Sequence, residues 1–296
     1  MDKKLGKGLD QLSQVFIDTQ SSVLDLRQAA QENRHKVSTT RVICILGTEG
    51  YITRNAFLTC NLSAALSRLG MKIAILDTNS SLSCRNFFFG EGNIPGTNSG
   101  DKEKIIKEGP LGIKLIPFTL DMTGAGTGEY AEILKDLKNN HYDLTLISAS
   151  ISDINIQALA KNIQTFILIA PAATPEMIKT YQIIKAIYYH NPRGEIGLVV
   201  DGAEEEFKAD SIFAKIAEVT SKYLNKEVLK FGNLCYKMKD LHCEKNRQTS
   251  HISIYDARLQ ASISNIAQII VLRMNVNNGS AEMIFSFEDL SKILEK

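Results

Sequence analysis

The first candidate for a functional site in the sequence is a short polar loop, GTEGYITRN, at residues 47–55. The loop joins an apolar run at 42–46 to a segment with helical periodicity at 56–69, which is where open α/β proteins bind phosphate. A phosphate cradle needs several glycines, so that backbone N–H groups converge, and then a Lys and a Ser or Thr for phosphate and Mg²⁺. This loop keeps only Gly47 and Gly50. Its position is typical of a phosphate loop, but its residue pattern is not.

A second group of reactive side chains lies near the C-terminal end. Cys235, His242, Cys243 and His251 are residue types that bind zinc, but their spacing matches none of the usual ligand pairs. No local arrangement of Ser, His and Asp supports a nucleophile. We therefore predict no metal site and no catalytic residue.

The elements that must position the loop alternate between strands and helices from Arg41 onward. Helical periodicity covers residues 56–69, 130–137, 175–189, 206–224 and 257–274. Short apolar runs, typical of buried strands, occur at residues 42–46, 72–76, 113–116, 144–147, 166–170, 196–200 and 228–231. This alternation predicts an α/β fold with a mostly parallel sheet and helices on both faces.

Composition excludes several classes of protein. Of the 296 residues, 44% are hydrophobic and 23% charged, which is ordinary for a globular chain and argues against disorder. The formal charge of +1 gives the whole surface no attraction to nucleic acid or anionic membrane. Five cysteines in a chain of this length do not make a disulfide framework. With no signal peptide and no bilayer-spanning run, we expect a cytoplasmic protein.

The first forty residues have the pattern of a helical arm and a linker. Apolar residues between 5 and 30 recur at steps of three and four, the seam of an amphipathic helix. In one interpretation this seam packs on its own domain; in the other it binds a protein partner in a groove or coiled coil. We predict an arm at 1–40, an α/β domain at 41–275 and a tail at 276–296. The candidate partner-binding residues are Leu9, Leu12, Phe16, Val23, Leu26 and Arg27.

The tail also has an amphipathic pattern. Ser286 and Asp289 form a capping box, and Ile284, Phe287 and Leu290 share a face. Four acidic and two basic residues at 282–296 give the wrong sign of charge for anionic lipid. We therefore expect weak or indirect membrane contact and favour packing or protein contact.

Several segments resemble the MinD/ParA family of deviant Walker ATPases. They lie at 41–47, 61–77 and 82–90, with the altered loop between the first two. Further segments, at 108–117, 174–185, 191–192, 198–201 and 231–232, resemble its flagellar branch, FlhG, also called YlxH or FleN. The resemblance implies a P-loop fold and a role in flagellar placement or number. It also implies an FlhF-like GTPase or a flagellar regulator or switch component as partner, at the cell pole or flagellar base.

The resemblance assigns roles to the loop, and here the sequence departs from the family. The lysine that reaches the partner's phosphates in the family corresponds to Glu49. The lysine that binds the β- and γ-phosphates falls at Arg54 or Asn55, and the Mg²⁺-binding Thr at Asn55 or Ala56. Glu49 is either a block to dimerisation or a product of drift. Arg54 either still holds a phosphate or is a solvated loop residue.

The remaining family positions are also altered. The family's Asp-x-Asp motif is Asp77-Thr-Asn79, its Walker B Asp matches Ser148, and its adenine-reading Asn matches Asp201. Asp77 either binds a metal or, as we expect, caps the strand end and hydrogen-bonds loop amides.

These replacements remove at least two charged contacts to the nucleotide. Each is worth roughly 1.5–3 kcal/mol, and losing about 4 kcal/mol weakens binding roughly 10³-fold. The leading interpretation is a non-catalytic pseudo-ATPase that binds protein partners and needs no cofactor. The alternative is a working ATPase with an unusual loop, using ATP and Mg²⁺ in flagellar or cargo positioning. A ParA-type cargo role would need a basic surface that the composition does not suggest.

Overall fold

The computed structural model describes residues 41–48, 52–78, 83–89, 107–117, 142–151, 156–235 and 257–276. The chain divides into two units, one made of Ser38–Ala267 and the other of Met1–Val37 with Gln268–Lys296. All strands of the described sheet belong to the first unit, and helix α9 (Ala257–Val276) crosses the boundary in sequence. The predicted helices at 5–30 and 130–137 and the tail beyond residue 276 lie outside the described residues.

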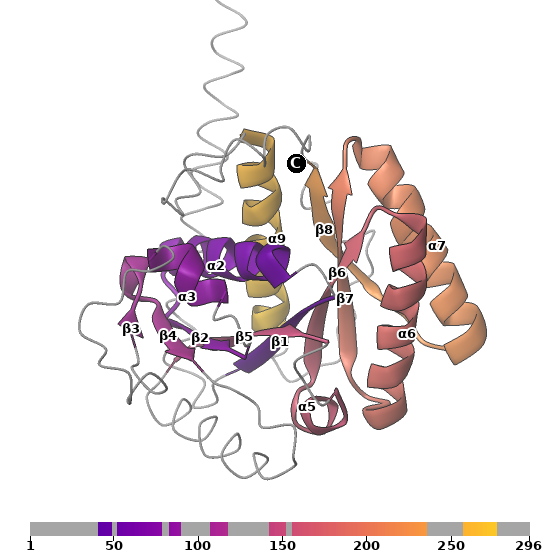
Figure 1. Cartoon of the computed structure of the whole chain (residues 1–296), viewed down its shortest axis with the longest axis horizontal. Coiled ribbons are helices and arrows are strands. Elements are labelled where there is room, and N and C mark those ends of the chain that lie inside the picture. The colour runs from indigo at the N-terminus through magenta and orange to yellow at the C-terminus, as the bar shows by residue number, and fades with distance from the viewer. Residues whose placement is uncertain are drawn as a thin grey trace, which may run out of the picture. The chain divides into compact units, whose positions relative to one another are not determined.

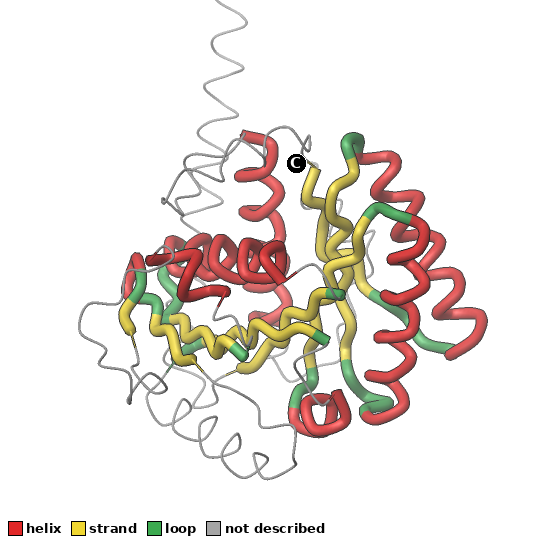
Figure 2. Tube along the Cα trace, viewed as in Figure 1, coloured by secondary structure: helices red, strands yellow, loops and turns green. Residues whose placement is uncertain are grey.

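Eight strands of the described residues form one sheet in the order β3-β4-β2-β5-β1-β6-β7-β8 (Figures 1 and 2). Neighbours are parallel throughout, except that β3 pairs antiparallel with β4. The predicted mostly parallel sheet is confirmed. The strands are β1 (Arg41–Gly47), β2 (Ile73–Asp77), β3 (Lys107–Glu108), β4 (Lys114–Pro117), β5 (Leu144–Ser150), β6 (Thr165–Pro171), β7 (Glu195–Ala203) and β8 (Leu229–Cys235).

Helices cover both faces of this sheet, as predicted (Figure 1). On one face α2 packs against β1, β2, β5 and α3. On the other, α6 packs against β6 and α7 against β7 and β8, while α5 packs against α6. The helices are α2 (Ile52–Arg68), α3 (Ser83–Phe89), α5 (Ile156–Asn162), α6 (Thr174–His190) and α7 (Glu206–Leu224), with a 3₁₀ turn, η1, at Pro110–Gly112.

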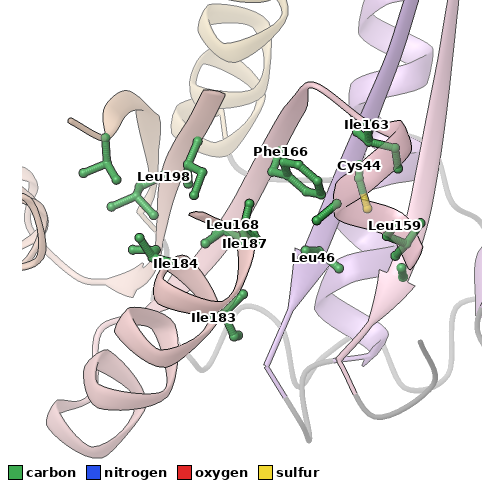
Figure 3. Packing of buried hydrophobic residues seen from close by; sticks show 14 of the residues in the cluster. Cys44, Leu46, Leu159, Ile163, Phe166, Leu168, Ile183, Ile184, Ile187 and Leu198 are labelled. Carbon is green, nitrogen blue, oxygen red and sulfur yellow. The ribbon is translucent and has the colours of Figure 1, made fainter. Parts of the chain in front are cut away.

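The core explains why the central strands are almost continuously apolar. Successive strand side chains point to opposite faces, so a strand covered on both sides has no position for solvent-facing residues. In Figure 3, Cys44 of β1 lies beside Leu159 of α5 and Ile163, and Leu168 of β6 lies beside Ile187 of α6. This packing fixes the strand ends, where the candidate site lies.

Two expectations about local structure are corrected. Helix α2 begins at Ile52 rather than at residue 56, so the end of the expected loop is the first turn of the helix. Helices α3 and α5 and strand β3 were not predicted, because each is seven residues or shorter and shows no clear periodicity. Within the described ranges, no helix has the length and apolar content needed to cross a bilayer.

Candidate functional site

The candidate site is the carboxyl edge of the sheet around β1. Strand β1 lies between β5 and β6. Strands β2 to β5 lie on one side of β1, and β6 to β8, which follow later in the sequence, lie on the other side. A ligand crevice forms at such a switch point, outside the carboxyl ends of the strands. Gly47 ends β1 and is in register with Ser150 of β5. Glu49, Gly50 and Asn79 lie outside the described residues.

On the β2 side of this edge, Asp77 and Ser148 are register partners on neighbouring strands, and both side chains are fully buried. The Asp77 carboxylate accepts hydrogen bonds from the backbone N–H groups of Cys84 (2.9 Å) and Arg85 (3.4 Å). These amides belong to the first turn of α3, so Asp77 stabilises the start of that helix. The sequence predicts that Asp77 binds amides of the loop, and the amides that the structure shows instead belong to the start of α3.

Ser148 is also part of the packed structure. Its backbone carbonyl accepts hydrogen bonds from the N–H (3.0 Å) and the hydroxyl (2.9 Å) of Thr78. Strand β5 continues to Ser150, so Ser148 lies inside the strand. A hydroxyl there has no negative charge with which to hold a metal ion.

Two buried thiols lie beside Asp77. The Cys60 thiol donates a hydrogen bond to the Cys84 carbonyl, with a sulfur–oxygen distance of 3.7 Å. Burial raises the pKa of the Cys84 thiol well above its ordinary value, and its hydrogen bond with Cys60 and the charge of Asp77 add to this. Burial also raises the pKa of Cys60. Both thiols are therefore unreactive at neutral pH, and no cluster of metal-binding side chains occurs in the described ranges.

The first turn of α2 carries Arg54 and Asn55. The Asn55 amide donates a hydrogen bond to the Ala149 carbonyl (2.5 Å) and so ties the helix to β5. Its Oδ1 atom and the hydroxyl of Thr48 are buried and have no hydrogen-bond partner among the described residues. Asn55 therefore uses its donor on the main chain of β5, while its acceptor atom is not satisfied by any described residue.

Arg54 forms an ion pair with Asp201, with 2.5 Å between Nη1 of Arg54 and Oδ2 of Asp201. The Arg54 side chain is 26% exposed and that of Asp201 1% exposed. Because β6 lies between β1 and β7, the pair spans the carboxyl end of β6. The expectation of a solvated Arg54 is wrong, because a helix start and a buried carboxylate hold it. The sequence analysis named both residues but not their pairing, because they are 147 positions apart and meet only through the order of the strands.

The charged groups that the structure describes at this edge do not favour a bound Mg²⁺–nucleotide, although the Thr48 hydroxyl and Asn55 Oδ1 have no partner among the described residues. Asp201 already neutralises Arg54, Asn55 donates to the main chain, and Ser148 offers no carboxylate. Phosphate binding needs a positive group that is open to the ligand, and Mg²⁺ at such a site needs a carboxylate or hydroxyl aimed at it. These contacts bring the predicted positions together in two groups, Asp77 with Ser148 and Arg54 with Asp201.

The sequence matches no protein-family model and no curated protein. Its fold is similar to solved structures. The MinC:MinD cell division protein complex of Aquifex aeolicus aligns over 78% of this chain and 96% of the other, with 16% identity and a TM-score of 0.60. A ParA family ATPase from Chlorobium tepidum aligns over 78% and 98%, with 11% identity and a TM-score of 0.56.

A third similar structure is an enzyme. Cobyrinic acid a,c-diamide synthase of Mycobacterium smegmatis, solved with an ATP analog and magnesium, aligns over 78% of this chain and 94% of the other, with 14% identity and a TM-score of 0.52. Because all these identities are low, the likeness concerns the fold. The chain therefore has the α/β fold found in MinD and ParA-type proteins.

Proposed function

We propose that this chain is a non-catalytic regulator of the MinD/ParA type, a pseudo-ATPase platform that binds protein partners. The observation that carries the proposal is the Arg54–Asp201 ion pair at the carboxyl edge of the sheet. By resemblance, Arg54 or Asn55 stands where the family binds phosphate, and Asp201 stands where it reads adenine. Here Arg54 and Asp201 bind each other instead.

The chemistry of hydrolysis supports the same conclusion. Phosphoryl transfer depends on a metal that bridges the phosphates and on a group that orients the attacking water. The Asp77 Oδ2 atom accepts the amides of α3, and by resemblance Ser148 stands in place of the Walker B carboxylate. Losing two charged contacts alone weakens a micromolar nucleotide site to about millimolar.

The process we propose is the placement or number of flagella, by resemblance to FlhG. The structurally similar MinD was solved in a complex with MinC, so a protein of this fold does assemble with a protein partner. For this chain we propose an FlhF-like GTPase or a flagellar regulator or switch component. The arm at 1–40 is the proposed docking element, and recruitment to the cell pole or flagellar base would follow from the partner.

Calorimetric titration of the full chain with Mg·ATP tests the proposal. We expect no saturable heat below about 1 mM ATP, since a site weakened roughly 10³-fold binds in that range. A parallel phosphate-release assay should give no turnover above buffer. ADP and Mg²⁺-free ATP serve as controls for non-specific anion binding. Micromolar, Mg²⁺-dependent binding would favour the alternative, a working ATPase with an unusual loop.

A further inference from the structure

The Arg54–Asp201 pair joins two parts of the site that are distant in sequence. Arg54 is the third residue of α2, at the end of the helix where backbone N–H groups and the helix dipole favour negative charge. Asp201 lies near the carboxyl end of β7, and its backbone carbonyl accepts the N–H of Ala172 at 2.9 Å. The main chain of β7 is thus fixed there, and it is the side chains that cross the end of β6.

The two side chains of the pair differ in their exposure to solvent. Asp201 is almost completely buried, whereas about a quarter of the Arg54 side chain is exposed. A buried carboxylate is costly unless it is paired and hydrogen-bonded. A polyphosphate that took Arg54 would deprive Asp201 of its guanidinium and would also lie beside a like charge. Both effects act against binding.

We infer that Asp201 sets the ligand specificity of this edge: it neutralises Arg54 and so excludes polyphosphate anions from an otherwise positive helix start. This inference rests on the proposed function, because it names the residue that keeps nucleotide out. Arg54 is the anion-binding group that the pair masks. The Asp201 carboxylate thus binds Arg54 at the position that an external anion would otherwise occupy.

Replacing the carboxylate by its neutral amide tests the inference. Asp201→Asn keeps the size and a hydrogen-bond acceptor for Arg54 but removes the charge. Titration with pyrophosphate and with ATP should show a gain in affinity of roughly tenfold or more, since at least one charged contact becomes available to the anion. The gain should disappear in the double variant Arg54→Ala/Asp201→Asn.

A matched control separates this effect from a change in net charge. Asp210 pairs with Lys230 at 2.6 Å, but its side chain is 50% exposed and the pair lies on α7 and β8. Asp210→Asn changes the net charge by the same amount and should leave anion affinity unchanged. Equal gains in both variants, or a folded Asp201→Asn variant that gains nothing, would overturn the inference.

A second measurement needs no ligand. In thermal unfolding, the loss of Tm in Arg54→Ala/Asp201→Ala should be clearly smaller than the sum of the losses in the two single variants, because each single variant removes the same ion pair. Additive losses in the double variant would contradict the pairing. Micromolar ATP binding by the unaltered chain would overturn the proposed function together with the inference. If neither the unaltered chain nor Asp201→Asn binds, only the inference fails.

Discussion

At the scale of single residues, the polar groups of the carboxyl edge are turned toward the protein itself. Asp77 binds the amides of α3, Asn55 donates to Ala149, and Asp201 pairs with Arg54. A nucleotide site needs groups that keep their charge or hydrogen-bonding capacity for the ligand. In the described residues these three side chains contact the protein's own main chain or side chains, as the proposed non-catalytic function requires.

Asp77 provides the clearest test of these contacts. Replacing it with Ala should lower the free energy of unfolding by about 2–3 kcal/mol, because a buried charged acceptor of two backbone amides is lost. Asp77→Asn should lose less, since its amide oxygen can still accept. Urea denaturation measures the change.

Asp143 is a suitable control for this substitution. Its carboxylate accepts the Lys72 N–H at 2.6 Å, but this bond is exposed and lies at the opposite end of the sheet. Asp143→Ala should therefore lose about 1 kcal/mol or less. If Asp77→Ala were no more destabilised than Asp143→Ala, the helix-stabilising role would be wrong.

Residue roles differ in how far they could be predicted from the sequence. Asp77 directly follows an apolar strand, and a carboxylate there is expected to bind nearby amides. The Arg54–Asp201 pair joins residues 147 positions apart, and it forms only because α2 starts at Ile52 and β7 lies one strand beyond β6. Such a pair depends on strand order, which a single sequence does not reveal.

At the scale of elements, β7 and β8 pack through a glycine. A Cβ placed on Gly197 would lie 2.1 Å from the Phe231 ring. Phe231 is buried, and two register shifts interrupt the pairing of its strand with β7. The neighbouring Gly232 has a φ of +146°, which an L side chain rarely adopts. The Phe231 ring thus fills the space that a Cβ atom at position 197 would need, so that only a glycine fits there.

Gly197→Ala should therefore destabilise the sheet. We expect a loss of about 1–3 kcal/mol in the free energy of unfolding, typical of an overpacked core, measured by urea denaturation. Adding Phe231→Leu should recover part of the loss in the double variant, although Phe231→Leu alone is destabilising. A neutral Gly197→Ala, or a double variant with strictly additive losses, would show that the ring can move away.

The elements themselves were largely predictable. Apolar runs correctly located β1, β2 and β4–β8, because strands covered on both faces have no polar alternation. Helix α3, with three consecutive Phe residues, has no one-sided pattern, and Phe87 packs edge-to-face on Phe57 at 6.0 Å between ring centroids. Contacts of this kind arise from tertiary structure, so local periodicity does not predict them.

At the scale of the whole molecule, the proposed loss of nucleotide binding at the carboxyl edge would leave partner binding to other parts of the chain. The formal charge of +1 gives the whole surface no strong electrostatic attraction to a partner, which favours apolar contact as a source of affinity. The apolar seam at residues 5–30 is the longest regular apolar pattern outside the predicted α/β domain. It is therefore where a change should affect partners without affecting the fold.

The double substitution Leu12→Asp/Phe16→Asp tests this, because it places two charges in the middle of the seam. We expect the tagged variant, purified from its own cells, to lose the partners that the unaltered chain retains, while its Tm changes by no more than about 2 °C. Gln14→Asp/Ser21→Asp adds the same charge on the opposite face of the predicted helix and should retain those partners. A large fall in Tm of the seam variant alone would mean that the seam packs on its own domain. Unchanged partner retention with an unchanged Tm would exclude the arm as the docking element.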